Sequence, residues 1–147
     1  MRIAVGSDHA AYEGPPPAFK PEIMRYVEEN GHTVLDCGTN GPESVDYPDF
    51  AQAVCAKVLS GEADAGVLMC GTGIGVAIAA NRHPGIRAAV CVTPEMARLS
   101  REHNDANVLC FGKRILSLEG ALEVLDAWLA TPFSNDDRHV RRIQKMG

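Results

Sequence analysis

The sequence has little of what marks several large classes of protein. There is no excess of basic residues: the 147-residue chain has a formal net charge of −5 at pH 7, which argues against general affinity for nucleic acid or anionic membranes. No uninterrupted apolar run approaches the length of a membrane span. We expect no signal peptide, because Met1–Ile3 leads directly into a predicted strand. These features predict one cytoplasmic domain over residues 1–147.

The cysteines are odd in number and show none of the spacings of a metal or disulfide framework. No two of them form a Cys-x-x-Cys pair, which argues against a zinc cage. No Asp, Glu and His cluster has metal-ligand spacing either, so we expect neither a metal nor another cofactor. A Gly-x-Ser-x-Gly elbow and a Gly-Lys-Ser/Thr phosphate loop are also lacking, which excludes a typical serine hydrolase and a P-loop nucleotide site. The five thiols are Cys37, Cys55, Cys70, Cys91 and Cys110.

What the sequence does have is a glycine-rich turn between a predicted buried strand, Ala65–Met69, and a predicted helix, Ile74–Ala80. Three glycines within Gly71–Gly75 allow positive φ and close approach to a ligand. The first amide groups of a helix favour an anion, and Cys70 faces that positive end, which predicts a lowered thiol pKa. The alternative interpretation is that the glycines serve close packing and that Cys70 is a structural cysteine.

Alternating strands and helices predict an α/β fold with a three-layer, doubly wound, five-stranded parallel sheet. The expected architecture is Rossmann-like or flavodoxin-like, with strand order 2-1-3-4-5. The predicted strands are Arg2–Gly6, His32–Cys37, Ala65–Met69, Ile86–Val92 and Asn107–Phe111. The first predicted helix begins near Ala18 or Pro21. The others are Asp49–Leu59, Ile74–Ala80, Thr93–His103 and Ser117–Leu129.

This strand order brings Asp8 and His9 beside Cys70, at the crevice between the first and third strands. A base next to backbone N–H donors suits removal of a carbon-bound proton, with the donors holding the enediolate oxygen. Thr72 adds a hydroxyl to this set. Two alternatives stay open: a cysteine hydrolase that pairs Cys70 with His9 or His103, and an Asp8 that only caps a turn.

His103 and Asn104 end the fourth predicted helix, near the same carboxyl edge if that helix is short. A histidine at a helix C-terminus is also explained by the helix dipole alone. The segment Thr131–Gly147 has too few apolar residues to bury by itself, so we expect it to be disordered or laid on something else. On an acidic protein, a local arginine group suggests a phosphate ligand, although a solvated charged face is the alternative. The unexplained cations are Arg114, Arg138, Arg141 and Arg142.

Six motifs in the same order along almost the whole chain resemble the B-type ribose-5-phosphate isomerases, a family that includes the galactose-6-phosphate isomerase subunits. The motifs are Ser7–Ala11, Ser44–Phe50, Cys70–Gly75, Ile78–Asn81, Arg101–Asn107 and Arg138–Arg142. The resemblance implies metal-free interconversion of ribose 5-phosphate and ribulose 5-phosphate through an enediolate, within the pentose phosphate pathway.

The resemblance also implies a role for each site residue. Cys70 is the base, Gly71–Gly75 stabilise the enediolate, His103 opens the sugar ring with help from Asp8, and Asn104 holds sugar hydroxyls. Thr72 joins Cys70, His103 and Asp8 as a catalytic residue, and His9 joins three arginines at the phosphate. The substrate-binding residues implied are Asp8, His9, Tyr47, Gly71, Thr72, Gly73, Ile74, Gly75, Asn104, Arg114, Arg138 and Arg142.

Members of this family are dimers or tetramers with sites completed across the subunit interface. We therefore expect a homodimer or tetramer in which the tail, residues 132–147, packs on a neighbouring subunit. The chain departs from the family pattern at Gly14–Ala18, which is inserted before Phe19-Lys20. This insertion is either an inert surface bulge or a change to the entrance that alters which sugar fits. The alternative functions are an isomerase of a six-carbon sugar phosphate, such as allose or galactose 6-phosphate, and a non-catalytic sugar-phosphate binding module.

Overall fold

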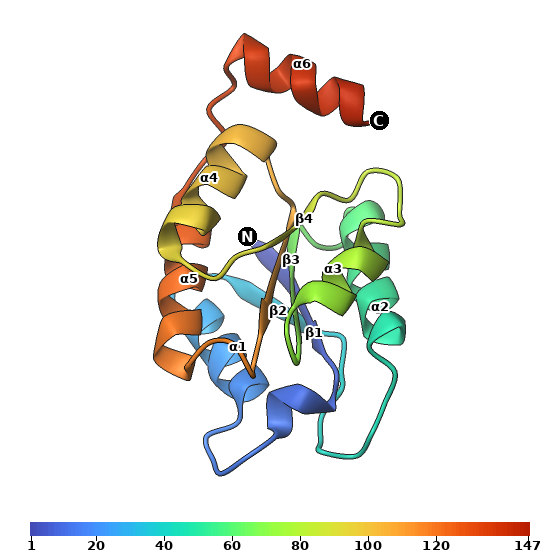
Figure 1. Ribbon diagram of the computed structural model, residues 1–147, viewed down its shortest axis with the longest axis vertical. Coiled ribbons are helices and arrows are strands. Elements are labelled where there is room, and N and C mark those ends of the chain that lie inside the picture. The colour runs from blue at the N-terminus through green and yellow to red at the C-terminus, as the bar shows by residue number, and fades with distance from the viewer.

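Five strands form one parallel sheet with helices on both faces (Figure 1). The computed structural model describes residues 1–147. The strands are β1 (Arg2–Ser7), β2 (Thr33–Asp36), β3 (Ala65–Cys70), β4 (Ala88–Val90) and β5 (Val108–Gly112). The helices are η1 (His9–Tyr12), α1 (Phe19–Glu29), α2 (Tyr47–Leu59), α3 (Ile74–Ala80), α4 (Pro94–Asn104), α5 (Leu118–Ala130) and α6 (Asp137–Met146). The predicted α/β class, with a Rossmann-like parallel sheet, is confirmed.

Each face of the sheet has its own core, because successive side chains of a strand point to opposite faces. Ile3 and Val5 of β1 pack with α1, α4 and α5, whereas Ala4 between them packs with α2 and α3. Gly66 lets α2 come close, since a Cβ there would lie 2.5 Å from Val54 Cγ1. All six residues of β3 are buried, which explains its uninterrupted apolar sequence.

The strand order is 2-1-3-5-4, so the predicted order 2-1-3-4-5 is wrong at its last two positions. Burial gives the physical reason. All five residues of β5 are buried, and this strand lies inside the sheet next to β3. The three residues of β4 are only partly buried, which suits an edge. The pairing of β1 with β3 is as expected, so the crevice that the prediction depended on is retained.

The C-terminal segment forms a helix, α6, that the sequence did not predict. Its single buried residue is His139, and it packs on the end of α4 (Figure 1, red helix). The backbone N–H of Ser134 donates to the carbonyl of Glu102 at 3.2 Å, which holds the connecting segment to α4. A sequence with few apolar residues gave little sign of this helix, because almost all of α6 is exposed.

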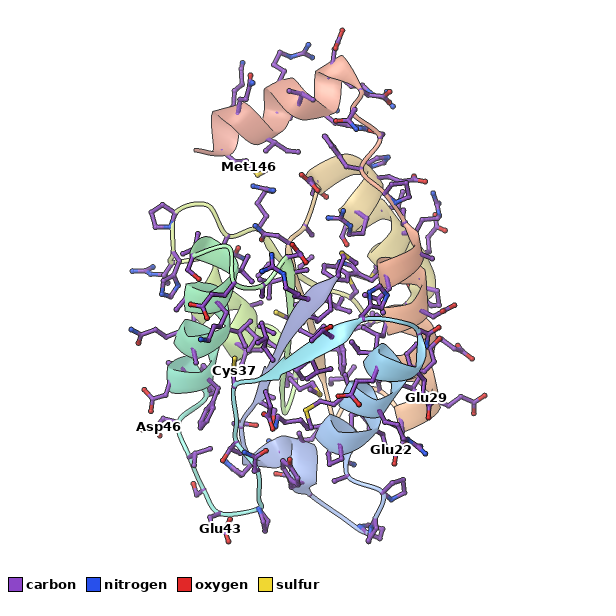
Figure 2. All side chains as sticks on the ribbon, turned by 180° about the vertical axis from the view of Figure 1, so that it is seen from behind. Glu22, Glu29, Cys37, Glu43, Asp46 and Met146 are labelled. Atoms are coloured by element: carbon purple, nitrogen blue, oxygen red, sulfur yellow. The ribbon has the colours of Figure 1, made fainter.

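The two ends of the molecule are well separated. In Figure 2, Glu43 and Asp46, in the loop after β2, lie at the opposite end from Met146, the last residue of α6. The inserted segment Gly14–Pro17 is an exposed loop between η1 and α1. No helix combines the length and the apolar character needed to cross a bilayer.

Candidate active site

The glycine turn at the end of β3 surrounds the sulfur of Cys70. This residue is 4% exposed, and its Sγ accepts a hydrogen bond from the backbone N–H of Gly73 at 3.2 Å. Gly73 has φ 84°, a left-handed conformation that suits glycine, and it starts α3. Thr72 Oγ1 accepts from the N–H of Ile74 at 3.1 Å. The turn therefore directs amide donors of a helix N-terminus towards a sulfur and a hydroxyl oxygen.

The turn is also interlocked with the end of β5. Lys113 N–H donates to the Cys70 carbonyl at 3.0 Å, and Arg114 N–H donates to the Gly71 carbonyl at 2.9 Å. A Cβ at Gly73 would lie 2.8 Å from the backbone of Phe111, closer than Cβ atoms approach in proteins. The glycines thus provide space for backbone-to-backbone contact as well as conformational freedom.

Asp8 and His9 follow β1 and lie beside this turn. The N–H of Asp8 donates to the carbonyl of Met69 at 3.2 Å, and its buried carboxylate accepts from the N–H of Ala10 at 2.9 Å. Asp8 therefore caps η1, as expected if its role were structural. It also lies next to the Cys70 turn. The Nδ1 of His9 accepts from the N–H of Val45 at 3.2 Å, which assigns the ring proton to Nε2 and leaves it free to donate.

Arg114 lies directly over the glycine turn. A Cβ at Gly71 would be 2.8 Å from its Nη1. Glu13 holds the other edge of the guanidinium, with Nε to Oε2 at 3.0 Å and a second contact from Nη2 to Oε1. This pairing with Glu13 raises the pKa of Arg114, as do the charges of Asp8 and Cys70, and it lowers the pKa of Glu13. Nη1 is thus the end of the group that faces the crevice.

Sequence reasoning missed Glu13, which immediately precedes the inserted loop, and it missed Lys20, which follows that loop. Lys20 is fully buried in α1. Its Nζ pairs with Asp36, and it donates to Asn40 Oδ1 at 2.8 Å. A fully buried lysine needs such partners, so this cluster fixes the loop that follows β2. That loop in turn supplies the Val45 N–H to His9.

Tyr47 starts α2 and is 40% exposed. A Cβ at Gly75 would be 2.7 Å from the tyrosine ring, so the ring covers the first turn of α3. The structure thus brings together, at one carboxyl edge, many of the predicted site residues. They are Asp8, His9, Tyr47, Cys70, Gly71, Thr72, Gly73, Ile74, Gly75 and Arg114.

His103 and Asn104 do not join them within the same chain, which corrects the expectation that α4 ends near the carboxyl edge. With 11 residues, α4 is about 16 Å long, as long as a five-residue strand, so it returns across the whole sheet. Its end is fixed at the amino edge, where Arg87 Nε donates to the Asn104 carbonyl at 3.0 Å. Asp8 and His103 of one chain are therefore at opposite edges and do not act together there.

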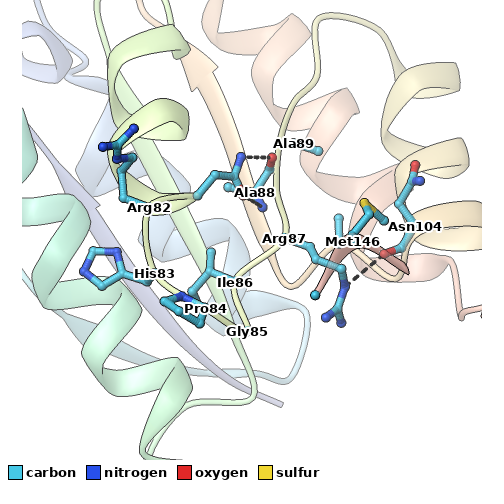
Figure 3. Close-up of a pocket in the computed structure, with 13 residues that line it drawn as sticks. Arg82, His83, Pro84, Gly85, Ile86, Arg87, Ala88, Ala89, Asn104 and Met146 are labelled. Carbon is cyan, nitrogen blue, oxygen red and sulfur yellow. Dashed lines mark hydrogen bonds between the residues drawn. The ribbon is translucent and has the colours of Figure 1, made fainter. Parts of the chain in front are cut away.

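The same amino end holds the predicted arginines of α6. The rings of His103 and His139 lie with centroids 4.3 Å apart, and Arg138 and Arg142 are exposed one helical turn from each other. A cavity of about 580 Å³ lies near this end. Its lining includes Asn104, Met146 and the loop between α3 and β4 (Figure 3). Among the predicted site residues, Asn104 alone lines it.

The other four thiols lie outside the glycine turn. Burial raises the pKa of Cys37, Cys91 and Cys110, and it raises that of Cys55 to about 11. Such thiols are poor nucleophiles at neutral pH. All five cysteines are free, and no group of three or more His, Cys, Asp or Glu side chains is arranged to hold a metal ion.

The chain is similar to known proteins over almost its whole length. The family model described as Ribose/Galactose Isomerase matches residues 3–146. Ribose-5-phosphate isomerase B of Escherichia coli is 46% identical over 143 residues, which is 97% of this chain and 92% of that protein. The structure of ribose-5-phosphate isomerase B from Clostridium thermocellum superposes with a TM-score of 0.94 at 50% identity, covering 100% of this chain and 95% of that one. A type B ribose 5-phosphate isomerase from Trypanosoma cruzi gives a TM-score of 0.93 at 45% identity, covering 99% and 95%.

Proposed function

Because the chain belongs to the ribose/galactose isomerase family, we propose that this isomerase interconverts ribose 5-phosphate and ribulose 5-phosphate. One observation supports the chemistry above all others: Cys70 Sγ lies 3.2 Å from the Gly73 N–H at the start of α3. A base is thereby placed against the donors that an enediolate needs.

In the proposed reaction, the Cys70 thiolate removes the proton from C2 of the open-chain aldose and returns it to C1. The electron pair of the C–H bond forms the enediolate, whose negative oxygen O1 is held by backbone N–H groups of Gly71–Gly75. The proton of the O2 hydroxyl passes to O1 before the thiol returns its proton to C1, which leaves the C2 carbonyl of the ketose. Arg114 faces this turn through Nη1 and adds a positive charge. The proton and the electron pair both stay within the sugar and the thiol, so the cycle needs no redox partner or metal.

Ring opening and phosphate binding are proposed to involve a neighbouring subunit. His103, Asn104, Arg138 and Arg142 lie at the amino end of their own chain, away from Cys70. In a homodimer, this end covers the carboxyl edge of the other copy and supplies the missing groups. His103 then opens the furanose ring with Asp8 of the other subunit, Asn104 holds sugar hydroxyls, and the arginines bind phosphate together with His9 and Arg114.

We place this enzyme in the cytoplasm, since five free thiols suit a reducing compartment, and in the pentose phosphate pathway. The first test is isomerisation by the purified protein in EDTA, with ribose, allose and galactose phosphates compared. Turnover fastest on ribose 5-phosphate and unaffected by chelator is expected. Activity only on a hexose phosphate changes the substrate and leaves the mechanism. No turnover on any of the three supports a binding module.

A mixing experiment tests the shared site. Cys70→Ala and His103→Ala should each be nearly inactive alone. If each site uses Cys70 of one subunit and His103 of the other, subunit exchange forms mixed dimers with one intact site of two. Random exchange should then restore about a quarter of wild-type activity, because half of the dimers are mixed. No recovery, with exchange verified by native mass spectrometry, would show that both residues act within one chain.

A further inference from the structure

His139 is the one buried residue of α6, a helix whose neighbouring side chains are mostly exposed. It is 5% exposed, whereas Val140 and Ile143 are only half-buried and Met146 is exposed. A polar ring is an unusual anchor for a helix.

The contacts of His139 connect α6 to α4 and to the segment before it. Its ring lies against that of His103, with centroids 4.3 Å apart and planes inclined by 37°. Its Nδ1 is 2.9 Å from Ser134 Oγ, which also accepts from the N–H of Asp136 at 3.2 Å. The Ser134 hydroxyl proton is then available to Nδ1, so a neutral His139 completes the network.

The charges around this ring disfavour its protonated form. The titratable groups that face it are His103 on α4, Asp136 before α6, and Arg138 and Arg142 on α6 itself. Burial lowers the pKa of His139, and the neighbouring His103 and Arg138 lower it further, while Asp136 opposes them and Arg142 adds a smaller lowering effect. A protonated His139 would be repelled by Arg138 and Arg142.

We propose that His139 is a positioning residue, whose neutral ring seats α6 on the end of α4 and sets the spacing between His103 and the arginines Arg138 and Arg142. The inference rests on the proposed function, in which these three residues form one unit that acts on a single sugar phosphate. A helix held by one buried side chain has few other contacts to fix its orientation. The contacts of His139 thus determine the position of the phosphate-binding arginines relative to His103.

The proposal has a defined pH dependence. Because the folded environment lowers the pKa of His139, the docking of α6 on α4 is fully stable above the ordinary histidine value of 6.5 and is lost as the pH falls below it. Undocking of α6 should therefore appear as faster amide exchange in residues 137–146 and as a higher KM for substrate in mildly acidic solution.

The experiment compares wild type, His139→Ala and His139→Phe as intact assembled proteins. Hydrogen exchange of the α6 peptide is measured by mass spectrometry at pH 5.5 and 7.5, with steady-state kinetics on ribose 5-phosphate. His139→Ala should speed exchange at both pH values and raise KM about tenfold or more, with a smaller change in kcat, since displaced contacts weaken phosphate binding. His139→Phe keeps a ring against His103 and should retain slow exchange and a KM within about threefold of wild type at pH 7.5.

The His139→Phe variant also separates the effect of His139 from that of other titratable groups. Any acid rise in KM that remains in this variant belongs to groups other than His139. The exchange rate of its α6, corrected for intrinsic pH effects, should become independent of pH. Gln144→Ala, an exposed residue of the same helix, is the matched control and should change exchange and KM little.

Two results would overturn the inference: unchanged α6 exchange in His139→Ala, or the same acid loosening of α6 in His139→Phe as in wild type. Faster exchange in His139→Ala, in a protein whose wild type turns over no sugar phosphate, would refute the proposed function and support the seat. The exchange measurement thus distinguishes the two failures.

Discussion

The carboxyl edge of the sheet and the C-terminal helix hold the two halves of the candidate site in opposite ways. At the carboxyl edge, Cys70 and His9 are fixed by hydrogen bonds from backbone N–H groups, and the glycine turn touches the backbone of β5. On α6, exposed arginines extend from a helix with one buried residue. Proton transfer requires atoms placed within tenths of an ångström, whereas long cationic side chains can adjust to a phosphate.

Removing the base should have the largest effect. Cys70→Ala is expected to lower kcat by about 10²- to 10⁴-fold, the usual contribution of a positioned base, and to leave substrate binding nearly intact. Turnover is followed by the ketose formed and binding by calorimetry. Cys37→Ala, which changes a half-buried thiol outside the turn, is the matched control and should stay within a few-fold of wild type. A Cys70→Ala protein with full turnover would assign the base elsewhere.

A substitution in the glycine turn, where it contacts β5, should have the next largest effect, on the free energy of unfolding. Gly73→Ala forces a side chain into a left-handed conformation and against the Phe111 backbone at 2.8 Å. The conformation alone costs about 1–2 kcal/mol, so the free energy of unfolding should fall by more than that. Gly61→Ala isolates the conformational part, because Gly61 has φ +81° and no atom within 4 Å. Equal losses in urea titrations of the two variants would show that the contact with β5 is unimportant.

Removing α6 should weaken substrate binding more than it disturbs the fold of the sheet. Deletion of residues 134–147 takes away Arg138 and Arg142 and only one side chain that is buried within its own chain. We expect KM for ribose 5-phosphate to rise about 10- to 100-fold, since charge-assisted phosphate contacts are lost. Far-UV circular dichroism checks that the remaining sheet is folded. An unchanged KM would remove both arginines from the site.

The smallest effect is expected at Tyr47, an exposed side chain of the carboxyl edge. Tyr47→Phe keeps the ring over Gly75 and removes one hydroxyl, so KM should rise less than about tenfold. Tyr47→Ala also uncovers the start of α3 and should raise KM further. If both variants behave alike, the hydroxyl rather than the ring supports binding.

Local patterns predicted most of the fold because they depend on nearest neighbours in the chain. The apolar run before Cys70 and the glycines after it were enough to place β3, the turn and α3. The predicted order of β4 and β5 was wrong because the order depends on which strand is buried on both faces. The predicted fourth strand, Ile86–Val92, is seven residues long and largely apolar, whereas β4 has only three residues, all partly buried.

The site was harder to predict wherever it depends on distance through space. The sequence does not show that α4 spans the sheet and carries His103 away from Cys70. Glu13, Lys20 and His139 act through partners that are remote in sequence or on another helix, and none has a motif of its own. They were found only from their contacts.

In the proposed homodimer, the length of α4 also makes activity depend on protein concentration. With His103 and Cys70 at opposite edges of one chain, an isolated subunit in the proposed arrangement has two half-sites and no complete one. Specific activity should then decline on dilution below the dissociation constant of the assembly, following mass action, and recover on concentration. The enzyme's output would depend on the square of its amount when it is scarce and become proportional to it when it is abundant.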